Sequence, residues 1–172
     1  MTRASTEDRR HAALRVLHLV DLTNLDEACS ENDVIRLCDR AHGRFGSVAA
    51  VCVWPRFVAL AHRRLQGSGI GVATVINFPH GNDSRGDIVA LIARCLDDGA
   101  DDIDLVLPYR DFLAGRMDRV DSILDAARAA VPSSAHLKVI LETGALVDPS
   151  VIRSAAERAL DHGADFIKTI RG

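Results

Sequence analysis

Short apolar runs alternate with amphipathic stretches along the chain, and this alternation predicts its secondary structure. Apolar runs bounded by turn residues are typical of strands, and apolar residues spaced three and four apart are typical of helices. The predicted strands are Val16–Asp21, Ser47–Val53, Ile70–Asn77, Asp102–Leu107, His136–Glu142 and Ala164–Ile170. The predicted helices are Asn32–His42, Pro55–Leu65, Arg85–Asp98, Arg119–Ala130 and Pro149–His162.

The residues at the ends of these helices agree with the prediction. Pro55 stands in a first turn, where its missing N–H is not needed. Gly99 and Gly163 follow the last turns of two helices, where glycine adopts the left-handed conformation that ends a helix. Strands separated by helices predict a parallel sheet with right-handed crossovers. Two α/β architectures fit, an open doubly wound sheet and a TIM (β/α)8 barrel, and no GxGxxG or P-loop follows the first strand to favour nucleotide binding.

Charged residues interrupt three of the predicted strands. Parallel strands are covered on both faces and are normally apolar throughout. Asp102 and Asp104 alternate with apolar residues in the fourth strand, as do Lys138 in the fifth and Lys168 in the sixth. The apolar residues must face the helices, so these charges point to the other side of the sheet, which is the interior of a barrel.

Two interpretations of these charges are open. They could form a buried ion pair that closes the core, or they could form a catalytic site, since barrel enzymes place such residues on successive strands. Burial and a second cation lower the pKa of a lysine, so Lys168 beside Lys138 is predicted to be neutral near physiological pH and able to form a Schiff base with a carbonyl. Asp104 would then transfer protons. No metal or other cofactor is expected, because the seven histidines have no metal-binding spacing and His80 stands alone.

Composition excludes several classes of protein. The 172 residues are 48% hydrophobic and 26% charged with a net charge of −3, which fits one domain over residues 1–172 and argues against nucleic acid as a partner. No apolar run is long enough to span a membrane, and the first residues lack a secretory signal. The four cysteines form no CxxC pair, so we expect reduced thiols and a cytoplasmic location.

Six segments together resemble the deoxyribose-phosphate aldolase family over nearly the whole chain. They occur in the order and spacing of that family, and several are uncommon strings. The segments are Asp21-Leu-Thr-Asn, AAVCVWPRFV (Ala49–Val58), VATVINFPHGN (Val72–Asn82), GADDIDLVLPYR (Gly99–Arg110), LKVILETG (Leu137–Gly144) and GADFIKT (Gly163–Thr169).

This resemblance implies a class I aldolase on a TIM barrel that needs no cofactor. It would reversibly cleave 2-deoxyribose 5-phosphate to acetaldehyde and glyceraldehyde 3-phosphate during deoxynucleoside catabolism. The Schiff-base lysine would be Lys168, with Asp104 as the proton relay and Lys138 lining the site. Asp21, Thr23, Cys52 and Thr169 would contact substrate, although Cys52 equally suits a small core residue.

The chain departs from the family after Thr169. The family continues with Ser-Thr-Gly-Lys, whereas this chain reads Ile170-Arg171-Gly172, and the later strands with the phosphate-binding loops are not present. A complete barrel has about 250 residues, so we expect a C-terminally truncated barrel of about six βα units. Its first and sixth strands would be free edges, which favours homo-oligomers or aggregation. Three outcomes are open: an active aldolase, a non-catalytic remnant, or a Schiff-base aldolase for unphosphorylated aldehydes.

Overall fold

Six parallel strands form one continuous sheet in the computed structural model, which describes residues 6–170. The order is β1-β4-β5-β6-β7-β8, so each strand pairs with the next one along the chain. The strands are β1 (Asp21–Asn24), β4 (Ala50–Val53), β5 (Gly71–Ile76), β6 (Asp102–Val106), β7 (His136–Glu142) and β8 (Phe166–Ile170). A small antiparallel hairpin, β2 (His42–Gly43) with β3 (Gly46–Ser47), lies before β4.

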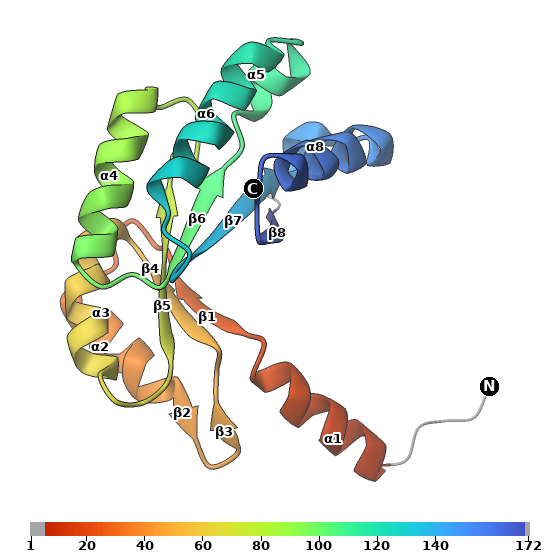
Figure 1. Cartoon of the computed structure of the whole chain (residues 1–172). Helices are drawn as coiled ribbons and strands as arrows, with labels where there is room; N and C mark the ends of the chain where they lie inside the picture. The colour runs from red at the N-terminus through yellow and green to blue at the C-terminus, as the bar shows by residue number, and fades with distance from the viewer. Residues whose placement is uncertain (1–5, 171–172) are drawn as a thin grey trace.

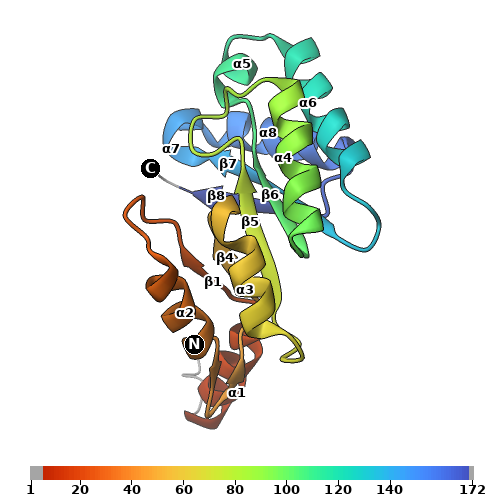
Figure 2. The ribbon, with the colours of Figure 1, turned by 90° about the vertical axis from the view of Figure 1, so that its left-hand side faces the viewer.

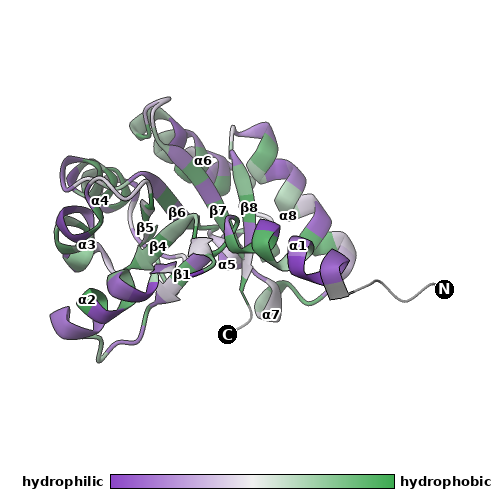
Figure 3. Cartoon of the chain, turned by 90° about the horizontal axis from the view of Figure 1, so that it is seen from below, coloured by the Kyte–Doolittle hydropathy of each residue, from purple (hydrophilic) through white to green (hydrophobic). Residues whose placement is uncertain are grey.

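Helices connect the strands and cover one face of the sheet. Seen from below, the strands form an arc and the crossover helices surround its outside (Figure 3). A view from the side places α3, α4 and α6 in front of the strands (Figure 2). The helices are α1 (Thr6–Leu17), α2 (Glu31–Arg40), η1 (Pro55–Phe57), α3 (Val58–Leu65), α4 (Arg85–Asp97), α5 (Tyr109–Leu113), α6 (Met117–Ala130), α7 (Thr143–Leu146) and α8 (Pro149–Asp161).

The sheet is a curled, incomplete barrel rather than a doubly wound sheet. A doubly wound sheet reverses its strand order at a switch point, and no reversal occurs here. Three strands lie between β1 and β7 in the sheet. The curl still brings Lys138 Nζ of β7 within 2.7 Å of Asp21 Oδ2 of β1. Within residues 6–170, β1 and β8 are the two edges of the sheet, as predicted.

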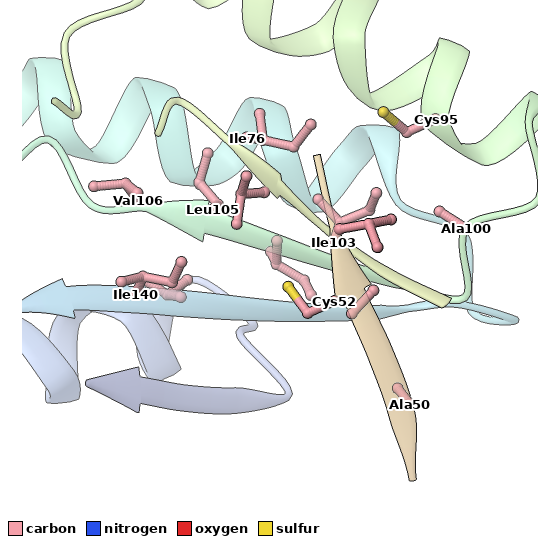
Figure 4. Packing of buried hydrophobic residues seen from close by; sticks show 14 of the residues in the cluster. Ala50, Cys52, Ile76, Cys95, Ala100, Ile103, Leu105, Val106 and Ile140 are labelled. Atoms are coloured by element: carbon pink, nitrogen blue, oxygen red, sulfur yellow. The ribbon is translucent and has the colours of Figure 1, made fainter. Parts of the chain in front are cut away.

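The hydrophobic core lies between the outer face of the sheet and the helices. Ile103, Leu105 and Ile76 point to this side, near Cys95 of α4, whereas Cys52 lies on the other side of the strands (Figure 4). Ile76, Ile103 and Leu105 are fully buried. Apolar burial of this extent is the main stabilising term in a domain of this size.

Local signals in the sequence explain where helices begin and end. Ser30 and Asp33 form a reciprocal capping box at the start of α2, and Ser84 caps α4. Gly99 and Gly163 adopt left-handed φ values of 95° and 83°, which confirms their predicted role after helices. No helix within residues 6–170 combines the length and apolar character needed to cross a membrane.

The first predicted strand is wrong over most of its length. Val16 and Leu17 end helix α1, and β1 begins only at Asp21. A short apolar run flanked by charges can belong to a helix or a strand, and here the run continues the helical spacing that begins at Thr6. The predicted strand Ser47–Val53 also divides into the end of β3 and the whole of β4. The other four strands agree within two residues at each end.

Candidate active site

Lys168 and Asp104 meet on the inner face of the sheet. Lys168 is on β8 and Asp104 on β6, and the strand between them aligns both side chains to the same face. Lys168 Nζ donates to Asp104 Oδ2 at 2.6 Å. The Asp104 side chain is fully buried, and that of Lys168 is 26% exposed. The amine is therefore within reach of a small molecule, while its carboxylate partner is shielded from water.

Lys138 lies beside this pair and contacts two other carboxylates. Its Nζ is 2.7 Å from Asp21 Oδ2 and 2.7 Å from Asp102 Oδ2, and it is 3.9 Å from Asp104 Oδ1. Lys168 Nζ also lies 3.4 Å from Asp21 Oδ2. One carboxylate oxygen of Asp21 thus links the two amines. The predicted convergence of Lys138, Lys168 and Asp104 in one site agrees with this geometry.

Asp104 is the most strongly desolvated charge in the site. Burial raises the pKa of its carboxyl above the ordinary range, and the two lysines oppose this effect. Its Oδ1 is the one buried side-chain oxygen or nitrogen within residues 6–170 that has no hydrogen-bond partner. An unsatisfied acceptor of this kind is costly to bury. Asp104 is therefore prepared to take up a proton.

The predicted lowering of the Lys168 pKa is wrong for this structure. Burial alone lowers the pKa of this amine, but the acidic groups around it outweigh burial and raise the pKa above its ordinary value. The pKa of Lys138 is raised as well, because Asp104, Asp102 and Asp21 outweigh its burial. The prediction counted Lys138 as an unneutralised cation, whereas Asp21 and Asp102 neutralise it.

Lys138, Lys168, Asp21, Asp102 and Asp104 form a lysine–carboxylate cluster. Cys52 lies next to it, with its Sγ 3.8 Å from Asp104 Oδ2. Its side chain is fully buried. Burial, followed by the charge of Asp104, raises the pKa of this thiol to about 12. The thiol is thus neutral near pH 7, and its full burial suits the small core residue that the sequence allowed better than a contact to substrate.

The two threonines proposed as substrate contacts do not join the cluster. Thr23 shares the inner face with Asp21, but its hydroxyl donates to the backbone oxygen of Asp21 at 2.9 Å. Thr169 follows Lys168 directly, so strand alternation places it on the opposite, outer face of β8.

An open cavity of about 680 Å³ adjoins the lysines at the beginning of the strands. Its lining includes Lys138, Lys168, Asp21, Asp102 and His136. Asp102 and His136 were not among the predicted site residues. The alternation in the fourth strand placed Asp102 on this face, and His136 stands two residues before Lys138, so the same period-two argument could have found both.

The amines of this site account for all the lysines of the protein. The 172-residue sequence contains two lysines, Lys138 and Lys168, and the rest of its 21 lysine and arginine residues are arginines. Lysine carries a nucleophilic amine once deprotonated, which arginine does not. Within the described residues, no three His, Cys, Asp or Glu side chains are grouped as metal ligands would be.

Comparison with known proteins gives close relatives over almost the whole chain. A deoxyribose-phosphate aldolase of Agrobacterium fabrum is 49% identical over 164 residues, which are 95% of this chain and 63% of that protein. A solved structure of a candidate deoxyribose-phosphate aldolase from Coccidioides immitis is 32% identical with a TM-score of 0.83, and the match covers 91% of this chain and 60% of that one. An aldolase called QR15 is 30% identical with a TM-score of 0.81, over 90% of this chain and 67% of its own.

The chain spans less than two thirds of the length of the Agrobacterium and Coccidioides relatives. The part that it does span contains the whole lysine–carboxylate cluster described above. A family model described as DeoC/LacD family aldolase matches residues 15–172. This protein belongs to the DeoC/LacD aldolase family.

Proposed function

We propose that this chain forms a Schiff base at Lys168 and acts as a deoxyribose-phosphate aldolase, cleaving 2-deoxyribose 5-phosphate reversibly to acetaldehyde and glyceraldehyde 3-phosphate. The observation that carries the proposal is the 2.6 Å contact between the partly exposed Lys168 amine and the buried carboxylate of Asp104. The 49% identity to the Agrobacterium fabrum aldolase supports the choice of substrate.

Asp104 supplies the base that Lys168 needs. Both groups are charged in the pair, and removing water from it favours transfer of the proton from the ammonium to the carboxylate, because neither product is charged. The raised pKa of Asp104 helps this transfer. Entry of a substrate carbonyl beside Lys168 excludes water from the open side and so increases the share of neutral amine.

The reaction then follows the chemistry of amines with aldehydes. The Lys168 amine attacks C1 of the sugar, the carbonyl oxygen takes a proton from Asp104, and loss of water gives a protonated imine. The 3-hydroxyl gives its proton to Asp104, which became a carboxylate in the first step, and the C2–C3 bond breaks. The electron pair of that bond moves toward the imine nitrogen as glyceraldehyde 3-phosphate leaves. Protonation at C2 and hydrolysis release acetaldehyde and free the amine. Lys138 remains charged and holds Asp21 and Asp102 around the reacting group.

Location and assembly form part of the same proposal. The enzyme would act in the cytoplasm during deoxynucleoside breakdown. It would assemble as a homo-oligomer through the edges of β1 and β8 that are unpaired within residues 6–170, because unpaired strand edges favour association.

A second substrate class is favoured by the charge of the cavity. Asp21, Asp101 and Asp102 line it beside the two lysines, and carboxylates repel a phosphate group. This balance favours an aldehyde without phosphate, on the same Schiff-base mechanism.

Turnover of two substrates tests both forms of the proposal. Release of acetaldehyde is measured with 2-deoxyribose 5-phosphate and with 2-deoxyribose, for the wild-type protein and for Lys168→Arg, which keeps the charge but not the nucleophile. The main proposal predicts faster release from the phosphate ester and none from the variant. Faster release from the free sugar would support the second class, and activity that survives in Lys168→Arg would reject both.

A further inference from the structure

His136 connects the lysine cluster to solvent. It pairs in register with Asp102, and its Nδ1 lies 2.8 Å from Asp102 Oδ1. The His136 side chain is 58% exposed, whereas that of Asp102 is 12% exposed. Phe166 packs edge-to-face against the imidazole with ring centroids 5.6 Å apart, which holds the ring beside the carboxylate. His136 can therefore exchange protons with water while it contacts a group of the site.

Asp102 connects His136 to the two lysine amines. Its second oxygen lies 2.7 Å from Lys138 Nζ, and Lys138 Nζ in turn lies 2.7 Å from Asp21 Oδ2. The same Asp21 oxygen is 3.4 Å from Lys168 Nζ. An unbroken series of charged contacts thus runs from His136 on the surface to Lys168.

The charge of this cluster depends on His136. Asp21, Asp102 and Asp104 carry one more charge than the two lysines balance, so the cluster is negative when His136 is neutral. Protonation of His136 removes that excess. A positive charge added close to an ammonium group makes the loss of its proton easier, and the effect is strong where water is partly excluded.

Three other titratable groups lie near His136 or line the same cavity, and two of them have hydrogen-bond partners. Asp165, before β8, accepts from the Leu137 backbone N–H and from Arg128. Asp101, before β6, accepts from the backbone N–H of Val72. His18 lines the same cavity. Within residues 6–170, Asp102 is the carboxylate that contacts both His136 and a lysine, so it carries the coupling.

We propose that His136 and Asp102 are positioning residues that set the share of neutral Lys168, with protonation of His136 making this amine easier to deprotonate. The inference rests on the proposed function for its importance in catalysis, since a neutral Lys168 is the nucleophile. The ionisation itself is a property of the protein without substrate.

Competitive acylation measures that ionisation directly. The wild-type protein is treated with trace acetic anhydride and a reference amine from about pH 5.5 to about pH 8.5, and acetylation of Lys168 and Lys138 is read by peptide mass spectrometry. Over the part of this pH range in which His136 loses its proton, the logarithm of the Lys168 acetylation rate should rise with pH at a slope below one, because the lost positive charge makes Lys168 harder to deprotonate. At the high end of the pH range, the Lys168 rate should therefore lag about threefold to tenfold behind the value that a slope of one would give.

His136→Gln should remove the lag and restore a slope of one. His162→Gln is the matched control, because His162 follows the end of α8 and contacts the carboxylates of Asp121 and Asp125 on α6, and it does not line the cavity. It should keep the wild-type profile. A wild-type slope of one throughout overturns the proposal, whether or not the variant folds, and so does a lag that persists in His136→Gln. Neither result depends on aldolase turnover, so failure of the proposed function would be seen separately in the acetaldehyde assay.

Discussion

Asp104 combines full burial with a 2.6 Å contact to the amine of Lys168, and this combination sets it apart from the other carboxylates of the site. Asp21 and Asp102 remain partly exposed at 17% and 12%. A fully buried carboxylate can stay charged only beside a cation, and it accepts a proton readily when that cation can lose one. The chemistry of the site therefore depends on the Lys168–Asp104 pair.

Replacing Asp104 by Asn should slow imine formation. Asparagine keeps the size of the side chain but cannot accept the proton of Lys168, so we expect the rate of imine formation with acetaldehyde to fall by about 10²-fold to about 10⁴-fold. Rapid mixing followed by quenching with borohydride measures this rate. Asp39→Asn, which breaks a surface pair with Arg64, is the control and should leave the rate unchanged. An unchanged rate in Asp104→Asn would show that another group takes the proton.

Lys138 should stabilise the fold at neutral pH and lose this effect at high pH. Its pKa is raised in the folded protein, so its contribution is fully present below the unfolded value of about 10.4 and is lost as pH rises above it. Urea unfolding of the wild type and of Lys138→Met, between about pH 8 and about pH 11.5, measures this difference. The stability advantage of the wild type should shrink only above about pH 10.4. An advantage that grows with pH would contradict the raised pKa.

At the scale of elements, the junctions between helices and strands depend on backbone geometry as well as on apolar pattern. Gly99 has a φ of 95° between α4 and β6, and a Cβ there would lie 2.5 Å from the ring of His62. Gly67 has a φ of 77° after α3, and a Cβ there would meet nothing within 4 Å. A side chain at either position would strain the backbone, but only at Gly99 would it also overlap a neighbouring residue.

Alanine at these two glycines should destabilise the protein to different extents. Gly67→Ala carries the left-handed strain alone and should cost about 1 kcal/mol. Gly99→Ala adds overlap with His62 and should cost about 1–3 kcal/mol more. Urea unfolding gives both values. Equal losses would mean that the ring of His62 moves aside freely.

The sequence was sufficient to predict the strands and helices whose hydrophobic pattern is local. The strands that carry Asp104, Lys138 and Lys168 were predicted from a period of two, and so was the face on which these residues lie. The run Val16–Val20 was misread because helix and strand patterns coincide over so few residues. The pKa of Lys168 was misjudged because its burial is outweighed by Cys52 and Asp104 and then by Asp21. Asp21 is 147 residues away in sequence and comes close only through the curl of the sheet.

At the scale of the whole molecule, the described part of the sheet has two edges and one open inner face. β1 and β8 each lack a neighbour on one side within residues 6–170. Strand edges with unpaired backbone groups tend to pair with other chains. The same openness leaves the Lys168 side chain 26% exposed, so assembly and chemistry are linked through β8.

A charge on the β8 edge should weaken self-association. Thr169 is exposed on this strand, and Thr169→Lys places a charge where a second strand would have to pair. Sedimentation over a range of protein concentrations should show a weaker association than for the wild type. Ser154→Lys adds the same charge on the exposed side of α8 and should behave like the wild type. Equal association in all three proteins would exclude the β8 edge as the contact.

The most direct test of the central claim is the identity of the amine that reacts with an aldehyde. The protein is incubated with acetaldehyde, reduced with borohydride and digested, and the amines of Lys138, Lys168 and Met1 are compared by peptide mass spectrometry. The account predicts that the reduced two-carbon adduct is found on the peptide that contains Lys168. An adduct confined to Lys138 or to Met1, or no adduct on the folded protein, would contradict it.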